Sequence, residues 1–526
     1  MLIGTLRSAA HMKSPRILES GVGVIRPLFI AACISPFLVL ITGALQNQQA
    51  DNLLPAFFST DRLTWFYWSQ SRFGNIDPVL AFPIQDIRLN LIFQVFLRVF
   101  SIVFVIVWVA QAVAATVRCE VLLAYLATGL FSVIWISKYA DGGDALLYGA
   151  NAHPLALPFV VLAIGIVLPS RFNIGRHNML SSARLLLLPL LFWMIALWTS
   201  VFVAMWAPAF MLILLAADSI MNQLSVKKVA GWVLWHLSCV ISSAVLWSLI
   251  AVRSGENGTF RFFGVKTAIT THQYIWNNLQ LAMLFCLLAL IIVRSWKAMG
   301  LVIAAGGLLI SIVPIAASNH VLNYEYMPRY FGVPLLFGSL IPFLMLSSWL
   351  FRRLKLVDIP LKWIRAERYL AIALIALGLT GVLLLVPQQI GYGTGEPDAI
   401  GFINTGNAMS ISEFEAMKAA TGIEFSFIAG NYWSVWPTVF ELRTQGVEIL
   451  GLTKKAMFQN HFAQLYSNGI VNGLCMDEIE NCYGAAINAQ LNGILLLTKV
   501  DDNPIATLLD GTPVRLMTVQ APVLTP

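Results

Sequence analysis

Long apolar segments dominate this chain up to about residue 387. Runs of about 18 or more apolar residues with few charges are typical of transmembrane helices. The pattern predicts eleven such spans, and the first is expected to be a signal anchor because its apolar core is too long for a cleavable signal peptide. The predicted spans are 27–45, 92–115, 121–137, 154–169, 185–201, 203–221, 230–251, 277–293, 299–317, 331–351 and 369–387.

One part of this pattern allows two interpretations. Residues 185–221 are almost continuously apolar. They fit either two short spans joined by a tight turn, or one long helix followed by a re-entrant piece.

The pattern changes after residue 387, where short apolar runs alternate with segments of helical period. Buried strands are predicted at 424–430, 446–452, 493–499 and 513–519. Helices are predicted at 410–421, which opens with a serine and a glutamate spaced as a capping box, and over the segment "NYWSVWPTVFELRTQ". Alternating strands and helices indicate a small α/β domain at 388–526, following a transmembrane domain at 1–387.

Composition and charge support this division. Hydrophobic residues make up 58% of the chain and charged residues only 11%, whereas soluble globular proteins carry about 25% charged residues. Lys and Arg collect in the loops that would be cytoplasmic if the N-terminus is cytoplasmic. With eleven spans, the C-terminal domain is then extracytoplasmic, and the protein is expected in the inner, or plasma, membrane.

Two cysteines test this orientation. Cys475 and Cys482 are the only cysteines of the predicted C-terminal domain, in the segment "CMDEIENC". Disulfides form in extracytoplasmic compartments, so we expect the two residues to be bonded there. Two cysteines without nearby histidines are too few for a zinc site.

Candidate chemistry concentrates in the first extracytoplasmic loop, residues 46–90. A helical period over 61–73 would place Asp61, Trp65, Trp68 and Arg72 on one face of an interfacial helix. Aromatic residues also gather at membrane interfaces without a catalytic role, and an aspartate at a helix start is often only a cap. Asp51, close to the end of the first span, is the competing carboxylate.

Polar residues occur in other segments of the same predicted side. The segment "SNHVLNYEYMPRYFGVP" precedes the tenth span, and arginine is the preferred partner of phosphate groups. In the C-terminal domain, Trp433 lies in "GNYWSVWPT", where indole rings and amides suit a sugar. A further histidine, His153, lies in the loop between the third and fourth spans. The candidate substrate-binding residues of these segments are His153, His320, Tyr324, Arg329, Tyr330 and Trp433.

Several classes of function are disfavoured by what the sequence lacks. It contains no nucleotide-binding loop and no HExxH, GxSxG or zinc spacing. Acidic residues are scarce within the spans, whereas ion-coupled transporters usually keep ionisable groups at mid-membrane. No nucleic-acid partner is expected.

The layout resembles the GT-C superfamily of membrane glycosyltransferases, which includes protein O-mannosyltransferases, aminoarabinose transferases, cell-wall arabinosyltransferases and oligosaccharyltransferases. The similarity lies in the many spans, the long first loop, the segments "MPRYF" and "AGNYWSVWPT", and the C-terminal domain. The acidic residues of the loop stand singly in "QADNLLP" and "STDRLTW", whereas several such families have a DE or DD pair. It implies transfer of a sugar from a polyprenyl-phosphate carrier to an extracytoplasmic glycan, lipid or protein.

The resemblance also implies a mechanism. Asp51 or Asp61 would act as general base on the acceptor hydroxyl, and a single displacement would invert the anomeric carbon. Arg72, Arg329 or a divalent cation such as Mg²⁺ or Mn²⁺ would stabilise the leaving phosphate. Two alternatives stay open: a polymerase or ligase of lipid-linked glycans, and a non-enzymatic lipid or glycan transporter.

Overall fold

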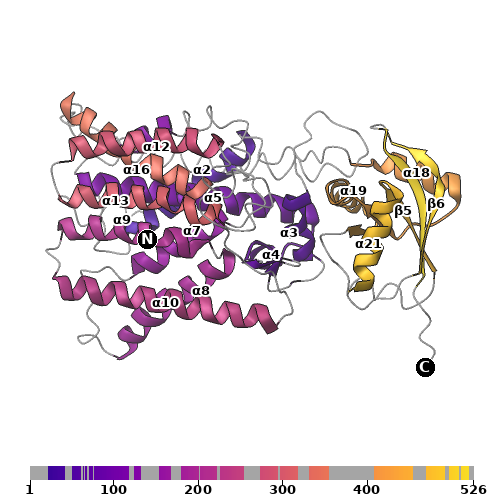
Figure 1. Cartoon of the computed structure of the whole chain (residues 1–526), viewed down its shortest axis with the longest axis horizontal. Helices are drawn as coiled ribbons and strands as arrows, with labels where there is room; N and C mark the ends of the chain where they lie inside the picture. Colours follow the sequence, from indigo (N-terminus) through magenta and orange to yellow (C-terminus); the bar gives the residue numbers. More distant parts are fainter. Residues whose placement is uncertain are drawn as a thin grey trace. The chain divides into compact units, whose positions relative to one another are not determined.

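Two compact units make up the chain, and each is considered by itself (Figure 1). The first comprises residues 1–42, 72–76 and 96–385, and the second comprises 43–71, 77–95 and 386–526. The structure is a computed structural model. It describes residues 22–41, 50–60, 63, 66–67, 70–74, 76–117, 124–131, 153–166, 179–200, 202–221, 225–253, 273–293, 296–317, 331–354, 408–453, 470–491, 497–508 and 511–520.

The first unit is mostly helical. A short helix covers residues 124–131. The longer elements are α2 (Val22–Ile41), most of α5 (Ile87–Val117), α7 (His153–Ile166), α8 (Met179–Thr199), α9 (Val203–Met221), α10 (Val226–Arg253), α12 (Gln273–Ile292), α13 (Trp296–Ile310), α14 (Ile312–Ala316) and α16 (Gly332–Arg353).

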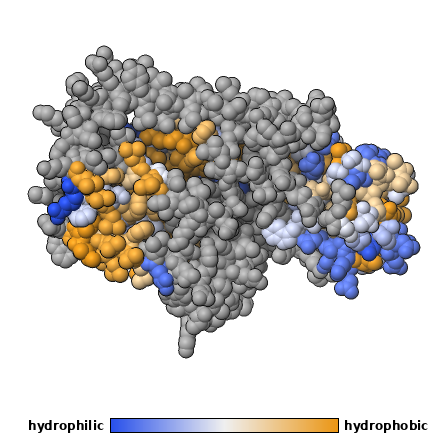
Figure 2. Space-filling view, turned by 90° about the horizontal axis from the view of Figure 1, so that it is seen from above, coloured by the Kyte–Doolittle hydropathy of each residue, from blue (hydrophilic) through white to orange (hydrophobic). Residues whose placement is uncertain are grey.

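Four helices among the described residues are long and apolar enough to cross a membrane. They cover Ile87–Val117, Val226–Ile250, Ala298–Ala316 and Gly332–Arg353. Helix α10 exposes large apolar side chains such as Leu234 at 64% and Ile241 at 61%. Figure 2 shows that the helical unit presents broad hydrophobic areas, whereas the C-terminal domain presents hydrophilic and hydrophobic residues side by side. Such a surface suits a lipid environment rather than water.

Described helices occupy most of the predicted spans, although only four of them meet the length and composition of a membrane-crossing helix. Residues 185–221 form two helices, α8 and α9, which are separated at Ser200–Phe202. The segment is therefore not one uninterrupted helix, and both predicted interpretations contain two such pieces. The predicted span 369–387 lies outside the described residues.

Close helix contacts hold the first unit together. Helix pairs α7–α8, α9–α13, α12–α16 and α13–α16 pack against each other. A Cβ atom added at Gly338 of α16 would lie 2.6 Å from Leu309 of α13, so the absence of a side chain lets the two helices approach. Helix α8 is joined to α10 by a hydrogen bond from Trp193 Nε1 to His236 Nδ1, 2.9 Å long.

The C-terminal domain contains a five-stranded sheet with the order β4-β3-β5-β7-β6. The three strands β4, β3 and β5 are parallel, whereas β7 is antiparallel to both β5 and β6. Its elements are α18 (Ile411–Thr421), β3 (Phe427–Gly430), α19 (Tyr432–Thr444), β4 (Leu450–Thr453), β5 (Ile470–Met476), α21 (Ile479–Leu491), β6 (Leu497–Thr507) and β7 (Pro513–Gln520).

Helices cover both faces of this sheet. Phe427 and Ala429 on β3 belong to one buried cluster with Cys482 and Ala485 of α21. Gly451 of β4 alternates with residues of that cluster and faces α19, because an added Cβ there would lie 2.9 Å from the Trp436 ring. The predicted α/β domain is therefore a sheet between two helical layers.

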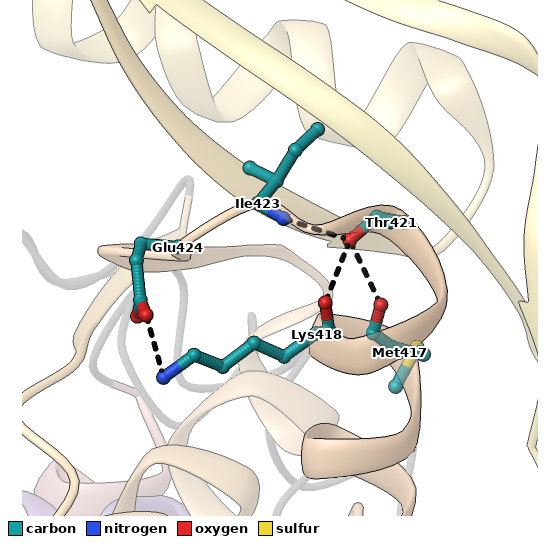
Figure 3. Close-up of polar contacts among 5 residues, drawn as sticks. All are labelled: Met417, Lys418, Thr421, Ile423 and Glu424. Atoms are coloured by element: carbon teal, nitrogen blue, oxygen red, sulfur yellow. Dashed lines mark hydrogen bonds and ion pairs between the residues drawn. The ribbon is translucent and has the colours of Figure 1, made fainter.

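Both ends of α18 follow the sequence signals. Ser410 accepts from the Glu413 backbone N–H, and Glu413 accepts in return from the Ser410 N–H, which confirms the predicted capping box. At the other end, Lys418 reaches Glu424 at 2.8 Å, as Figure 3 shows. This ion pair raises the pKa of Lys418, but exposed pairs of this kind contribute little stability.

The first loop differs from its predicted form. The described part of it contains α3 (Ala50–Thr60), α4 (Ile76–Ala81) and a two-stranded sheet of β1 (Phe66–Tyr67) and β2 (Gln70–Gly74). The predicted interfacial helix at 61–73 is therefore wrong, and the face proposed for Asp61 and Arg72 does not exist as a helical face. Aromatic residues favour strands as well as interfaces, so the same residues satisfy both patterns.

Candidate active site

Helix α3 of the first loop packs on helix α19 of the C-terminal domain, and both belong to the second unit. Phe57 is fully buried, with its ring centroid 5.3 Å from that of Trp436 and 6.2 Å from that of Phe440. The guanidinium of Arg443 lies 5.4 Å from the centre of the Phe57 ring. Burying one phenylalanine stabilises a fold by about 1.5–3 kcal/mol, so this contact is a substantial link between the two segments.

A buried asparagine joins the pieces of the loop. Asn90 of α5 donates from Nδ2 to Ser59 Oγ (2.8 Å), to the Ala81 carbonyl (3.0 Å) and to the Ile84 carbonyl (2.7 Å). Ser59 in turn donates to the Pro78 carbonyl at 2.9 Å. One side chain therefore connects α3, the end of α4 and the first turn of α5.

The start of α5 is held from two directions. Asp86 accepts from the backbone N–H groups of Arg88 and Leu89, at 3.0 and 2.9 Å, and so acts as the helix cap. The Arg88 guanidinium donates to the Thr444 carbonyl at the end of α19. Burial raises the pKa of Glu441, and the charge of Arg88 and a hydrogen bond from Gln445 partly oppose this rise.

The structure places some of the predicted site residues by their backbone alone. Asp51 is the second residue of α3, Arg72 lies in β2, and His153 is the first residue of α7. Their side chains lie outside the described residues, as do the complete residues Asp61, Trp65, Trp68, His320, Tyr324, Arg329 and Tyr330. Of the two candidate bases, Asp51 therefore has a known element, and that element packs on α19.

The two tryptophans of "GNYWSVWPT" have different environments. Trp436 is 1% exposed and belongs to the core between α19 and the sheet, whereas Trp433 is 42% exposed. Trp433 lies in the first turn of α19, where its backbone N–H donates to Asn431 Oδ1 at 3.0 Å. Only Trp433 is therefore accessible to a ligand.

Asp77 and Arg98 are buried ionisable residues that were not nominated from the sequence. Asp77, in the first turn of α4, is completely buried, although the sequence suggests no more than a loop carboxylate. Arg98 is 1% exposed within the membrane-length helix α5. An ionisable residue within a membrane segment often marks a functional site.

A helical period was the missed signal for Arg98. Asn90, Gln94, Arg98 and Ser101 follow one another at intervals of three or four residues, and all four are buried. Residues at this spacing lie on one face of a helix. Gln94 Nε2 donates to Asn90 Oδ1 at 2.6 Å, so this polar stripe begins at the asparagine that organises the loop.

The described residues were also considered as possible metal ligands. The part of the chain that the structure describes contains no group of three His, Cys, Asp or Glu side chains that could hold a metal. Cys475 and Cys482 are joined by a disulfide with an S–S length of 2.05 Å.

No protein-family model matches the chain, and no curated protein matches it. The function is therefore argued from the residues and their arrangement.

Proposed function

We propose that the protein is an inverting membrane glycosyltransferase that moves a sugar from a polyprenyl-phosphate carrier to an extracytoplasmic glycan, lipid or protein acceptor. The observation that carries this proposal is the packing of α3 on α19. This contact joins the first loop to the C-terminal domain in one unit, and it supports the helix that bears Asp51.

This packing supports the predicted topology. Two segments can form one buried core only if both lie on the same side of the membrane. The chain between α3 and α19, residues 61–431, must then cross the membrane an even number of times. Eleven spans, with the loop after the first and the domain after the last, meet this condition, and the disulfide fits an oxidising extracytoplasmic compartment.

The chemistry requires a base at the acceptor and a cation at the leaving group. A carboxylate can take the proton from an acceptor hydroxyl as that oxygen attacks the anomeric carbon. The phosphate carrier leaves already charged, so it needs electrostatic stabilisation more than a proton. Asp51 or Asp61 is proposed as the base, and Arg72 or Arg329 as the phosphate partner.

The assay that tests this function uses the purified full-length protein in liposomes. Polyprenyl-phosphate carriers bearing different labelled sugars are incorporated together with an extract of cell-surface glycans. Transfer of label to the extract, with one carrier phosphate released for each sugar, supports the proposal. Movement of the intact lipid between leaflets without sugar transfer would instead support a transporter, and elongation of a lipid-linked glycan would support a polymerase.

A further inference from the structure

The parallel strands of the C-terminal sheet create a specific place for a ligand. Strand β3 is followed by α19 and the neighbouring strand β5 by α21. These two helices cover opposite faces of the sheet, as the contacts of Gly451 and Ala485 show. Open α/β sheets bind ligands outside the carboxyl ends of adjacent strands whose following helices diverge in this way.

Polar and aromatic groups lie at the end of β3. The strand ends at Gly430. Asn431 is the next residue, and Trp433 is the second residue of α19. The Trp433 ring is 42% exposed and stands at 90° to the Tyr432 ring, with the centroids 4.9 Å apart. A large exposed indole ring fixed by a neighbouring aromatic residue offers a flat apolar surface of defined orientation.

A carboxylate lies at the end of β5. An added Cβ at Gly430 would be 3.1 Å from Asp477 Cβ, so the ends of the two strands are in contact. Asp477 Oδ1 accepts from the Glu478 backbone N–H at 2.7 Å, while its Oδ2 is a buried acceptor with no hydrogen-bond partner among the described residues. An acceptor in this state is expected to gain from a donor supplied by a ligand.

The turn that carries Asp477 is held on both sides. The disulfide between Cys475 and Cys482 spans the turn. On the other side, Arg515 Nη1 donates to the Asp477 carbonyl at 3.0 Å. The carboxylate is therefore preorganised relative to the end of β3, which reduces the entropic cost of binding a ligand there.

We propose that the carboxyl ends of β3 and β5 form a carbohydrate-binding site, with Trp433 stacking on a sugar ring and Asp477 accepting from sugar hydroxyls. A sugar ring offers C–H groups on one face and hydroxyl donors at its rim. These groups suit an exposed indole after the end of β3 and a carboxylate with one unsatisfied oxygen at the end of β5. This inference rests on the proposed function in assigning the bound glycan to the acceptor, whereas glycan binding itself does not depend on sugar transfer.

The test measures binding of a panel of fluorescently labelled, short linear hexose and pentose oligosaccharides to the full-length protein in nanodiscs. We expect at least one oligosaccharide to bind the wild type, and Trp433→Ala to weaken that binding about tenfold or more. Asp477→Asn, which preserves the shape of the side chain, should also weaken it. Trp349→Ala is the matched control because Trp349 of α16 is 41% exposed, and it should bind as the wild type does.

The outcomes separate this inference from the proposed function. If the protein binds a glycan through Trp433 but transfers no sugar, the binding site is supported and the proposed glycosyltransferase function is refuted. Sugar transfer by a protein that binds no panel member overturns the site instead. Equal binding by the wild type and a correctly folded Trp433→Ala variant also overturns it.

Discussion

Phe57 of the first loop lies against Trp436 of the C-terminal domain, with the two ring centroids 5.3 Å apart and both side chains at most 1% exposed. The two residues come from opposite ends of the chain, and the first long apolar segment ends only shortly before α3. The arrangement of α3, including its first turn with Asp51, therefore depends on a domain that follows the last predicted span.

Replacing Phe57 with alanine should destabilise the second unit by about 3–5 kcal/mol, because it removes a buried aromatic ring and leaves a cavity against α19. The expected readouts are a lower apparent melting temperature of the detergent-solubilised protein and faster proteolytic cleavage within the C-terminal domain. Phe82→Ala is the control, since Phe82 is 50% exposed in the turn after α4. Equal effects of the two substitutions would contradict the packing of α3 on α19.

Local sequence signals predicted much of the C-terminal domain. The capping box at Ser410, the helix starting after Asn431 and strands β3, β4 and β7 are all present. Strand β6 covers Leu497–Thr507, so it shares only its first three residues with the strand predicted at 493–499. Strand β5 was not predicted, because Asn472 and Gly473 interrupt its apolar pattern. Gly473 is explained only by the folded sheet, where the Phe427 ring occupies the space that a side chain would need.

The candidate site was less accessible to sequence reasoning. The aromatic residues of 61–73 fit a helical period, yet strands form at 66–67 and 70–74. A local helical period does not show that Phe57 packs on Trp436, or that Asn90 bonds Ser59, which is 31 residues away. Nor does the sequence distinguish the buried Trp436 from the exposed Trp433, since both lie in one helix and only the position of the sheet separates them.

Asn90 provides a second test of the loop. Asn90→Ala removes the donor shared by Ser59 Oγ and two carbonyl groups, and unsatisfied buried acceptors cost about 1–3 kcal/mol each. We expect a destabilisation of about 2–3 kcal/mol, measured as an apparent melting temperature. Gln85→Ala removes an exposed amide that bonds the Phe82 carbonyl, and it should change stability by less than about 0.5 kcal/mol.

Glu441 makes the stability of the second unit depend on pH. Burial raises its pKa in the folded protein, so the folded state binds more protons, and stability falls as pH rises through the folded pKa. Glu441→Gln should therefore raise the melting temperature relative to the wild type at pH 7, with a smaller difference near pH 4. The exposed Glu448→Gln is the control. A difference that does not vary with pH would contradict the burial of the Glu441 carboxylate.

The disulfide should stabilise the C-terminal domain. Replacing both Cys475 and Cys482 with serine frees a short loop, and the chain-entropy relation gives a loss of about 2–3 kcal/mol. Melting of the wild type with and without a reductant, compared with the double variant, measures this loss. Cys286→Ser, which removes a free thiol, should leave the response to the reductant unchanged. A reductant that lowers the melting temperature of the double variant as much as that of the wild type would contradict this assignment.

The proposed catalytic carboxylate provides the most direct test of the account. Wild type, Asp51→Asn and Asp61→Asn are compared for transfer of a labelled sugar from a polyprenyl-phosphate carrier, with folding checked by melting temperature. The account predicts that one of the two variants folds normally and loses transfer by about a hundredfold or more. Transfer at the wild-type rate by both variants would contradict it.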